Sequence, residues 1–394
     1  MKNFTKILGF KSCLSLGAIL LAGCGGGSPS YSVLPTGQSF TQSASSFNNQ
    51  LDILWVVDNS SSMAPLQANM ASNFQSFIKT FQTQGYDYRM VVTGTDAYKA
   101  NKSFVQYNAG NANLSLFQDG ACCGTPSGVF VIIPSTPNLD STFVTNATTG
   151  INGSGDERAF SSITTAMANT SNPAFLRSSS FFAVIILSDE DDFSNYSRTE
   201  DSWGGNDALD HCYVNSAMDT VATTAYSGPT HVTTCANQTP PDTVASYESA
   251  LDTLTQSTGA TRRWNVSTIA VLDSACQLSH SQSNSESYVS IIGQRYMQIS
   301  KDTSGVQGSI CDASYATSLA SIATQITTLS TQFFLNKTPQ VNTIVVTVNG
   351  AVIPQNATNG WQYNSTANSI LFYGTAVPAQ GASINVAFVP TNIQ

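Results

Sequence analysis

Apolar residues recur with two different spacings along the chain, and these spacings predict strands and helices. Residues 51–57 and 181–187 are almost continuously apolar, which is typical of strands buried on both faces of a parallel sheet. Apolar residues recur every three to four positions over 66–81 and 315–329, which predicts amphipathic helices. Weaker patterns predict further strands at 88–95, 129–133 and 267–272, and further helices after residue 157 and over 243–256.

The order of these elements predicts the fold class. Strands that alternate with helices form βαβ units, so we expect an α/β domain over 51–335 with a doubly wound, mostly parallel sheet and helices on both faces. Residues 190–240 are polar and irregular, which predicts a long insertion in that domain. Beyond it, short alternating strands around the turn pair Asn349-Gly350 predict a small antiparallel β module over 336–394.

The N-terminal segment has the pattern of an export signal. Three lysines precede an apolar stretch that is too short to span a bilayer, and Leu21-Ala22-Gly23-Cys24 follows. This end resembles the lipobox of bacterial lipoproteins, in which the cysteine is acylated and becomes the first mature residue. The resemblance implies a signal peptide over 1–23, a lipid on Cys24 and a place in the cell envelope. An ordinary signal peptide with an incidental cysteine is the alternative.

The residue after Cys24 indicates which membrane would carry the lipid-anchored protein. Gly25, where an aspartate would imply retention at the inner membrane, favours the outer membrane as an implication of the same resemblance; the periplasmic and the surface face both stay open. Small polar residues dominate 24–50, which predicts a flexible tether between the lipid anchor and the folded domain.

Charged residues are scarce. They make up 10% of the chain, against about 25% in an average soluble protein, while 41% of residues are hydrophobic, which is too apolar for a disordered chain. The formal net charge is −9. Binding of phosphate backbones needs clustered lysine and arginine, so this balance disfavours nucleic acid as a partner.

An even number of cysteines is left once the signal is removed and Cys24 carries lipid. In an exported chain such a set predicts disulfides, and Cys276–Cys311 is the pair we favour. A zinc site that would combine two other cysteines with His211 and His231 lacks the usual ligand spacing and is disfavoured. The four cysteines whose pairing stays open are Cys122, Cys123, Cys212 and Cys235.

Oxygen-bearing side chains follow two of the predicted core strands. A D-x-S-x-S sequence, Asp58 to Ser62, follows the first strand, and Ser188-Asp189 follows 181–187. A third group, Gly153 to Glu157, precedes a predicted helix. Ligands of such sheets bind at the carboxyl ends of the strands, and hard oxygen donors suit Mg²⁺, Mn²⁺ or Ca²⁺ better than zinc. The alternative is that the aspartate and serines at 58–62 only cap the following helix. The predicted ligands are Asp58, Ser60, Ser62, Ser154 and Asp189.

These three motifs, in this order, resemble a von Willebrand factor type A domain with a metal-ion-dependent adhesion site, and the resemblance covers roughly 51–335. It implies that 58–62 supplies the D-x-S-x-S ligands and that Asp189 is the aspartate of the third loop. Ser154 stands where the family usually has threonine, with Asp156 as the other candidate of that loop. In such a site the cation keeps a position for a carboxylate of a protein partner, so chelation should abolish binding.

Acidic residues crowd just beyond the strand at 181–187. A second calcium site at Glu190, Asp191 and Asp192 is one interpretation, because packed carboxylates repel one another without a cation. A solvated acidic loop is the other interpretation.

No enzyme signature accompanies these motifs. The sequence has no G-x-S-x-G, no P-loop and no dinucleotide fingerprint. We therefore expect a binding protein and no enzyme: a cell-envelope lipoprotein that binds a protein partner through a divalent cation. The alternatives are an envelope scaffold or assembly factor with a structural metal site and, less favoured, a metal-dependent hydrolase.

Overall fold

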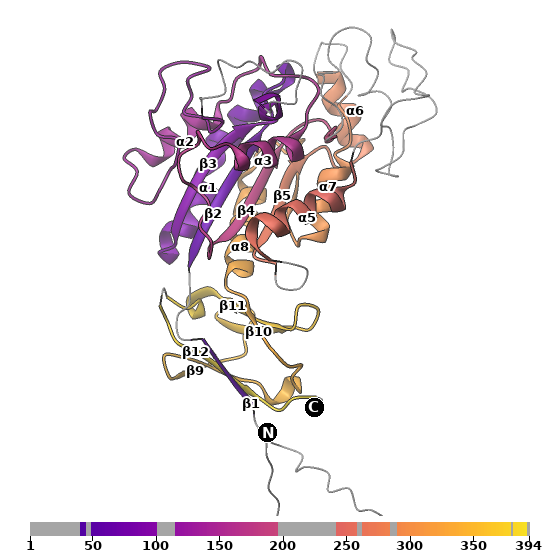
Figure 1. Cartoon of the computed structure of the whole chain (residues 1–394). Coiled ribbons are helices and arrows are strands. Elements are labelled where there is room, and N and C mark those ends of the chain that lie inside the picture. Colours follow the sequence, from indigo (N-terminus) through magenta and orange to yellow (C-terminus); the bar gives the residue numbers. More distant parts are fainter. Residues whose placement is uncertain are drawn as a thin grey trace, which may run out of the picture. The chain divides into compact units, whose positions relative to one another are not determined.

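Five parallel strands form the main sheet of the computed structural model, in the order β3-β2-β4-β5-β6 (Figure 1). All side chains of β4 and β5 are buried, as expected of strands covered on both faces. This confirms the predicted parallel α/β sheet. The strands are β2 (Gln50–Val57), β3 (Asp87–Gly94), β4 (Phe181–Leu187), β5 (Trp264–Ala270) and β6 (Gln307–Ser309).

Helices cover both faces of this sheet, as predicted. On one face, Trp55 of β2 packs edge-on against Phe77 and Phe143, which belong to two different helices. On the other face, Leu54 and Val56 of the same strand share a second apolar core with three further helices. The first group is α1 (Ala64–Gln84), α2 (Leu139–Ala147) and α8 (Ala316–Ser330); the second is α3 (Ala159–Ala168), α5 (Val244–Thr255) and α7 (Gln294–Asp302).

The strand order reverses direction between β2 and β4. From β2 the chain continues to β3 on one side, whereas from β4 it continues to β5 and β6 on the other. The carboxyl ends of β2 and β4 are therefore neighbours, and the backbone N–H of Asp58 donates to the carbonyl of Leu187 at 2.9 Å. Such a reversal is where ligands bind in open α/β sheets.

A β module with two antiparallel sheets confirms the predicted C-terminal module. Asn349 and Gly350 both have positive φ angles and turn the chain between two of its strands. One sheet has the order β1-β12-β8-β9, from β1 (Phe40–Ala44), β12 (Ile384–Phe388), β8 (Val345–Val348) and β9 (Ala351–Ile353). The other has the order β10-β11-β7, from β10 (Gly360–Asn364), β11 (Ser369–Tyr373) and β7 (Phe333–Phe334).

Two predictions made from local pattern are wrong in part. The predicted tether over 24–50 includes β1, which pairs antiparallel with β12. Its polar sequence has no strand pattern of its own, and the edge of a distant strand supplies the pairing. The predicted strand at 129–133 is reduced to one antiparallel bridge between Met90 and Ile132.

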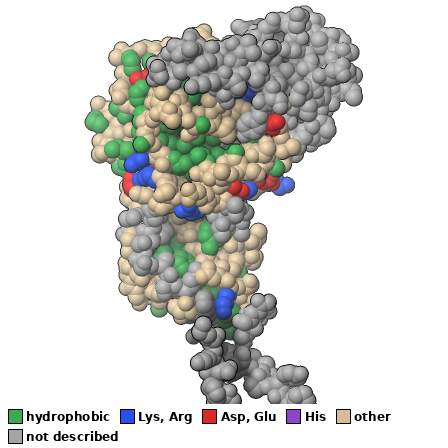
Figure 2. Space-filling model, viewed as in Figure 1, with side chains coloured by type: hydrophobic (Ala, Val, Ile, Leu, Met, Phe, Trp, Pro, Cys, Tyr) green, Lys and Arg blue, Asp and Glu red, His purple; other side chains and the backbone are tan. Residues whose placement is uncertain are grey.

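The structure describes residues 40–44, 49–100, 115–195, 242–257, 262–283, 290–379 and 381–391. The predicted signal over 1–23, Cys24, most of the predicted insertion, Cys212 and Cys235 lie outside these residues. Within the described ranges, no helix combines the length and apolarity that a membrane crossing requires. Figure 2 shows few charged side chains on the face in view, in keeping with the composition.

Candidate metal centre

The D-x-S-x-S segment begins where β2 ends and folds back on its own aspartate. The Asp58 carboxylate is fully buried and accepts a hydrogen bond from the backbone N–H of Ser60 at 2.8 Å. The hydroxyls of Ser60 and Ser62 lie 3.2 Å apart. Three of the predicted ligands thus lie within one short turn.

Asp189 comes to this turn from the end of β4. The Ser62 hydroxyl donates to Asp189 Oδ1 at 3.1 Å, across 127 residues of sequence. The preceding hydroxyl, of Ser188, lies 2.8 Å from Asp58 Oδ2. The neighbouring ends of β2 and β4 therefore bring together the side chains that strand order alone predicted to meet.

Glu157 is a residue of this centre that the sequence interpretation left out of the ligand set. It lies two residues before α3, and its Oε2 is 2.8 Å from the Ser188 hydroxyl. Its other oxygen, Oε1, is buried and has no hydrogen-bond partner among the described residues. Its place in the third motif, directly after Asp156, was the available signal.

The three carboxylates form a cluster suited to a cation. Asp58, Glu157 and Asp189 each offer an oxygen, and these oxygens lie within 4.8 Å of one another in a buried setting. Of the residues described, no lysine or arginine forms an ion pair with any of the three, whereas three other buried aspartates each pair with an arginine. The donors are hard oxygens, so they fit Mg²⁺, Mn²⁺ or Ca²⁺. The arginine-paired aspartates are Asp52, Asp156 and Asp192.

Burial and mutual repulsion change the protonation of this cluster. Burial, reinforced by the charge of Asp58, raises the pKa of Asp189 to about 7. Burial raises the pKa of Glu157 well above its usual range, and the charges of Asp58, Glu190 and Asp189 raise it further. Without a cation, the centre therefore holds protons at neutral pH.

The helix-capping alternative for Asp58 and the serines is wrong. A short 3₁₀ turn, Ser61–Met63, precedes α1, and its N-cap residue, Ser60, makes no capping bond through its side chain. The N-cap residue of α1 is Met63, which cannot make such a bond. The polar side chains of this segment point instead to one another and to Asp189.

The first residues of the third motif approach the centre through their backbone. The N–H of Gly153 donates to the carbonyl of Asn59 at 2.7 Å. Ser154 is buried, and its hydroxyl accepts the N–H of Asp156 at 3.2 Å. The Asp156 carboxylate is bound by Arg158, whose Nε lies 3.0 Å from Oδ1. Asp156 is thus committed to an ion pair, and Glu157 is the carboxylate of this loop that reaches the cluster.

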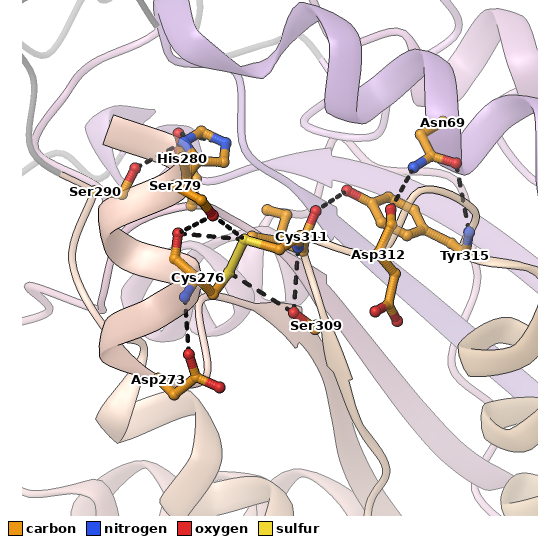
Figure 3. Close-up of a disulfide and its surroundings, with 12 residues drawn as sticks. Asn69, Asp273, Cys276, Ser279, His280, Ser290, Ser309, Cys311, Asp312 and Tyr315 are labelled. Atoms are coloured by element: carbon orange, nitrogen blue, oxygen red, sulfur yellow. Dashed lines mark hydrogen bonds and ion pairs between the residues drawn. A yellow bond between two sulfur atoms is a disulfide. The ribbon is translucent and has the colours of Figure 1, made fainter. Parts of the chain in front are cut away.

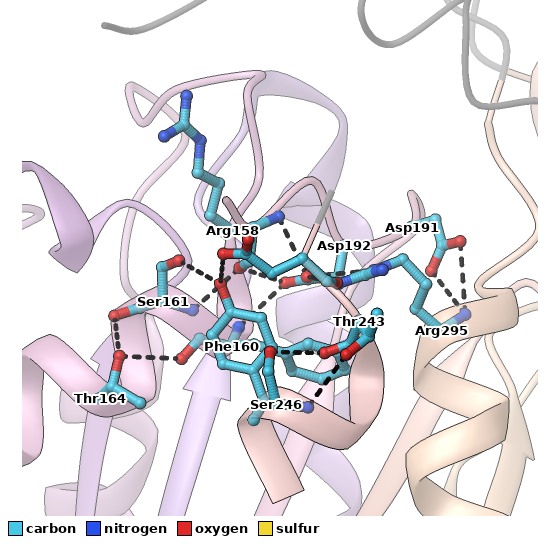
Figure 4. A network of polar contacts seen from close by, with 12 residues as sticks. Arg158, Phe160, Ser161, Thr164, Asp191, Asp192, Thr243, Ser246 and Arg295 are labelled. Atoms are coloured by element: carbon cyan, nitrogen blue, oxygen red, sulfur yellow. Dashed lines mark hydrogen bonds and ion pairs between the residues drawn. The ribbon is translucent and has the colours of Figure 1, made fainter. Parts of the chain in front are cut away.

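The predicted second calcium site is not supported, because two of its carboxylates are held by Arg295 and by helix N-termini (Figure 4). The backbone N–H of Arg295, in the first turn of α7, donates to Asp191 Oδ1 at 3.0 Å. The Arg295 guanidinium pairs with Asp192 at 3.2 Å, and Asp192 also accepts the N–H of Phe160 at the start of α3. Arg295 balances the charge of Asp192, and Asp191 accepts a backbone N–H; among the described residues, neither aspartate nor Glu190 is part of the metal-capable cluster.

Two disulfides occur in the described part of the chain. Cys276–Cys311 confirms the favoured pair. Cys122 and Cys123, whose partners the sequence left open, are bonded to each other. This bond packs against Gly150, since a Cβ added there would lie 3.1 Å from the sulfur of Cys123.

Comparisons with known proteins give weak similarities. No protein-family model matches the chain, and no curated protein matches it. Among solved structures, it is similar to the pilus adhesin SpaC from Lactobacillus rhamnosus GG, with 11% identity and a TM-score of 0.33 over 89% of this chain and 41% of that one. It is also similar to proximal thread matrix protein 1 from the mussel byssus, with 8% identity and a TM-score of 0.32 over 76% of this chain and 52% of that one. The chain thus spans roughly half the length of these proteins or less, and at such TM-scores the function has to be argued from the site itself.

Proposed function

We propose that the chain is a binding protein of the cell envelope in which a divalent cation takes a carboxylate from a protein partner. The observation that supports this most directly is the buried cluster of Asp58, Glu157 and Asp189, which has no arginine or lysine partner among the described residues. Carboxylates packed in this way repel one another until a cation or protons balance them. The order of the three motifs, which resembles a von Willebrand factor type A domain, agrees with this proposal.

Charge balance decides how such a centre can accept a further carboxylate. A divalent cation with three ionised carboxylates would carry a net charge of −1 and repel an acidic partner. With Glu157 protonated, the two aspartates neutralise the cation and leave it able to attract one more anion. The Ser188 hydroxyl supports this protonated form, because it lies 2.8 Å from both Asp58 and Glu157 and has one proton to donate. We assign the charge of the site to Asp58 and Asp189.

The neutral groups then have separate roles. Protonated Glu157 can donate to the hydroxyl oxygen of Ser188, which in turn donates to Asp58. Ser60 and Ser62 are weak neutral ligands from the D-x-S-x-S turn, and Ser62 is only partly buried, so the partner would approach from this side. A bound cation supplies the Lewis acidity that attracts the partner's carboxylate. Weak ligands leave much of that attraction available.

The cellular setting belongs to the same proposal. The lipobox-like sequence ending at Cys24 supports a lipid anchor, and the outer membrane is the location that Gly25 favours. We propose a binding role and no catalytic activity, because the sequence carries none of the hydrolase or nucleotide-binding motifs named above. A scaffold or assembly factor with a structural cation is the alternative, and it corresponds to a centre in which all three carboxylates are ionised.

Metal titration of the purified mature chain tests the centre first. Isothermal titration with MnCl₂ and MgCl₂ should show one site, and Asp58→Asn should weaken it at least tenfold. Asp87→Asn is the matched control. Asp87 lies at the amino end of β3, whereas the metal centre lies at the carboxyl ends of the strands of the same sheet. Absence of binding to the wild-type chain would reject the proposal.

A second experiment tests the partner. Envelope extracts are passed over the immobilised chain with Mn²⁺ or with EDTA, using wild type, Asp58→Asn and Asp87→Asn. A partner that is retained only with Mn²⁺ and lost with Asp58→Asn supports carboxylate capture at the cation. Retention under all these conditions would favour the scaffold.

A further inference from the structure

The side of the metal centre formed by α6 (Ser274–Ser283) contains a histidine that none of the sequence motifs include. His280 is 8% exposed, and its Nε2 lies 3.8 Å from Asp189 Oδ2. Asp189 Oδ1 accepts the Ser62 hydroxyl, so the two oxygens of this carboxylate face different neighbours. One oxygen faces the D-x-S-x-S turn and the other faces α6.

Ser290 determines which ring nitrogen can serve Asp189. Its hydroxyl lies 2.8 Å from Nδ1 of His280 (Figure 3). When this hydroxyl donates to Nδ1, the ring proton is on Nε2, the nitrogen that faces Asp189. This tautomer directs an N–H towards Asp189 Oδ2, although the separation of 3.8 Å is longer than a direct hydrogen bond.

The same short segment also holds the backbone of Asp189. The N–H of Ile291 donates to the carbonyl of Asp189 at 3.3 Å, and the side chain of Gln277, on α6, donates to the carbonyl of Ser290 at 2.7 Å. Asp189 is thus restrained at both its main chain and its carboxylate by one unit, composed of α6 and residues 290–291.

A disulfide fixes α6 in this position. Cys276 lies one turn before His280 on the same face of the helix and is bonded to Cys311, which follows β6 (Figure 3). Asp273 accepts the N–H of Cys276 at 2.8 Å and so caps the start of the helix. The histidine therefore belongs to a helix that is covalently tied to the segment after β6, which restrains where its backbone lies relative to Asp189.

We propose that His280 is a positioning residue of the metal centre: its Nε2–H faces Asp189 Oδ2 across 3.8 Å and attracts it, which favours the orientation in which the other oxygen is directed towards the cation. This inference rests on the proposed cation centre. Groups that orient metal ligands in this way typically change metal affinity 10- to 100-fold when removed. Without His280, the contact with Ser62 would be the remaining side-chain hydrogen bond described for this carboxylate, and part of the binding energy would be lost in ordering it.

Manganese titration of variants tests this role. We expect His280→Ala to weaken Mn²⁺ binding 10- to 100-fold, and Ser290→Ala to weaken it by a smaller factor. His280→Gln keeps an N–H donor and should recover affinity to within about threefold of wild type. Leu278→Ala, on the exposed side of the same helix, is the control and should bind as wild type does.

Thermal unfolding in EDTA separates positioning from stability. A purely structural histidine would lower the melting temperature of the metal-free chain without changing the dissociation constant of Mn²⁺, and this result would overturn the proposal. Equal affinities for wild type and His280→Ala would do the same. If His280→Ala does not fold, equal affinities of wild type and Ser290→Ala would count against it. A wild-type chain that takes up no Mn²⁺ would reject the metal centre itself, whereas binding by wild type with unaltered variants rejects only the role of His280.

Discussion

Asp58 and Glu157 both lie 2.8 Å from one hydroxyl oxygen, that of Ser188. A hydroxyl has a single proton to donate, so it cannot satisfy both carboxylates when both are ionised. The arrangement becomes consistent when Glu157 keeps its own proton and donates to the Ser188 oxygen. This local proton count is the physical basis for treating Glu157 as the neutral member of the cluster.

Glu157→Gln tests that assignment. Glutamine is neutral and can donate to the same hydroxyl oxygen, so Mn²⁺ affinity should stay within about threefold of wild type. Asp189→Asn, which removes a charge that the cation needs, should lose at least tenfold. Isothermal titration measures both. A loss for Glu157→Gln as large as that for Asp189→Asn would mean that three ionised carboxylates hold the cation, which favours a structural ion.

Stability of the metal-free chain should depend on pH in a defined direction. Asp189 has a folded-state pKa of about 7, and the pKa of Glu157 is raised as well, so the native chain holds protons that the unfolded chain releases near pH 4. The free energy of unfolding in EDTA should therefore fall as pH rises from about 4 to above 7. Urea unfolding at several pH values measures it, and a stability that rises over this range would contradict the burial argument.

Cation binding should show the opposite dependence. Mn²⁺ binds the ionised form of Asp189, so its affinity should fall below about pH 7 as that carboxyl takes up a proton. Saturating Mn²⁺, at 100 times its dissociation constant, would stabilise the native chain by about 2.7 kcal/mol. The melting temperature should then rise by several degrees at pH 8 and by less at pH 5, as scanning fluorimetry would show.

Arg295 should be far more important for stability than a partly exposed arginine. Its guanidinium is buried against Asp192, so Arg295→Met would leave a buried carboxylate without its partner and cost about 3–5 kcal/mol. Arg262 pairs with Glu248 and Asp252 but is 20% exposed, and Arg262→Met should cost about 1 kcal/mol or less. Urea unfolding of the two variants makes the comparison; similar losses would show that Arg295 is not the counter-ion described here.

The two disulfides should differ in their effect on stability. Cys276–Cys311 closes a loop with a sequence separation of 35, so its removal by paired serine substitutions should cost roughly 3–4 kcal/mol in the chain-entropy account. Cys122–Cys123 joins adjacent residues and closes no such loop, so its removal should cost about 1 kcal/mol or less. Chemical unfolding of the two double variants tests the contrast.

Some parts of the centre could be predicted from sequence because they depend on strand ends. Asp58 and Asp189 each follow a continuous apolar run, and neighbouring parallel strands bring such ends together. Glu157 could not be assigned in this way, because its place depends on how the loop from Gly153 folds back onto Asn59. A loop path of that kind has no periodic signature in the sequence.

Two other differences between the sequence predictions and the structure arise from partners that are distant in the sequence. Acidic crowding suggested a cation at Asp191 and Asp192, but Asp192 pairs with the guanidinium of Arg295, 103 residues further along the sequence, and Asp191 accepts the backbone N–H of that arginine. The strand β1 is similar, since its partner β12 lies at the other end of the chain. Local composition can indicate that a segment needs a counter-ion or a pairing strand, but it does not identify which distant residues supply it.

The contact between Ser62 and Asp189 joins two points that are 127 residues apart in the sequence. A cation held from both sides of this contact would close a loop of that length, much as a disulfide does, but reversibly. Loop closure restricts the unfolded chain, and the restriction grows with loop length. Partner binding and resistance to unfolding would then depend on the same ion. Removal of the metal would weaken partner binding and lower the free energy of unfolding together.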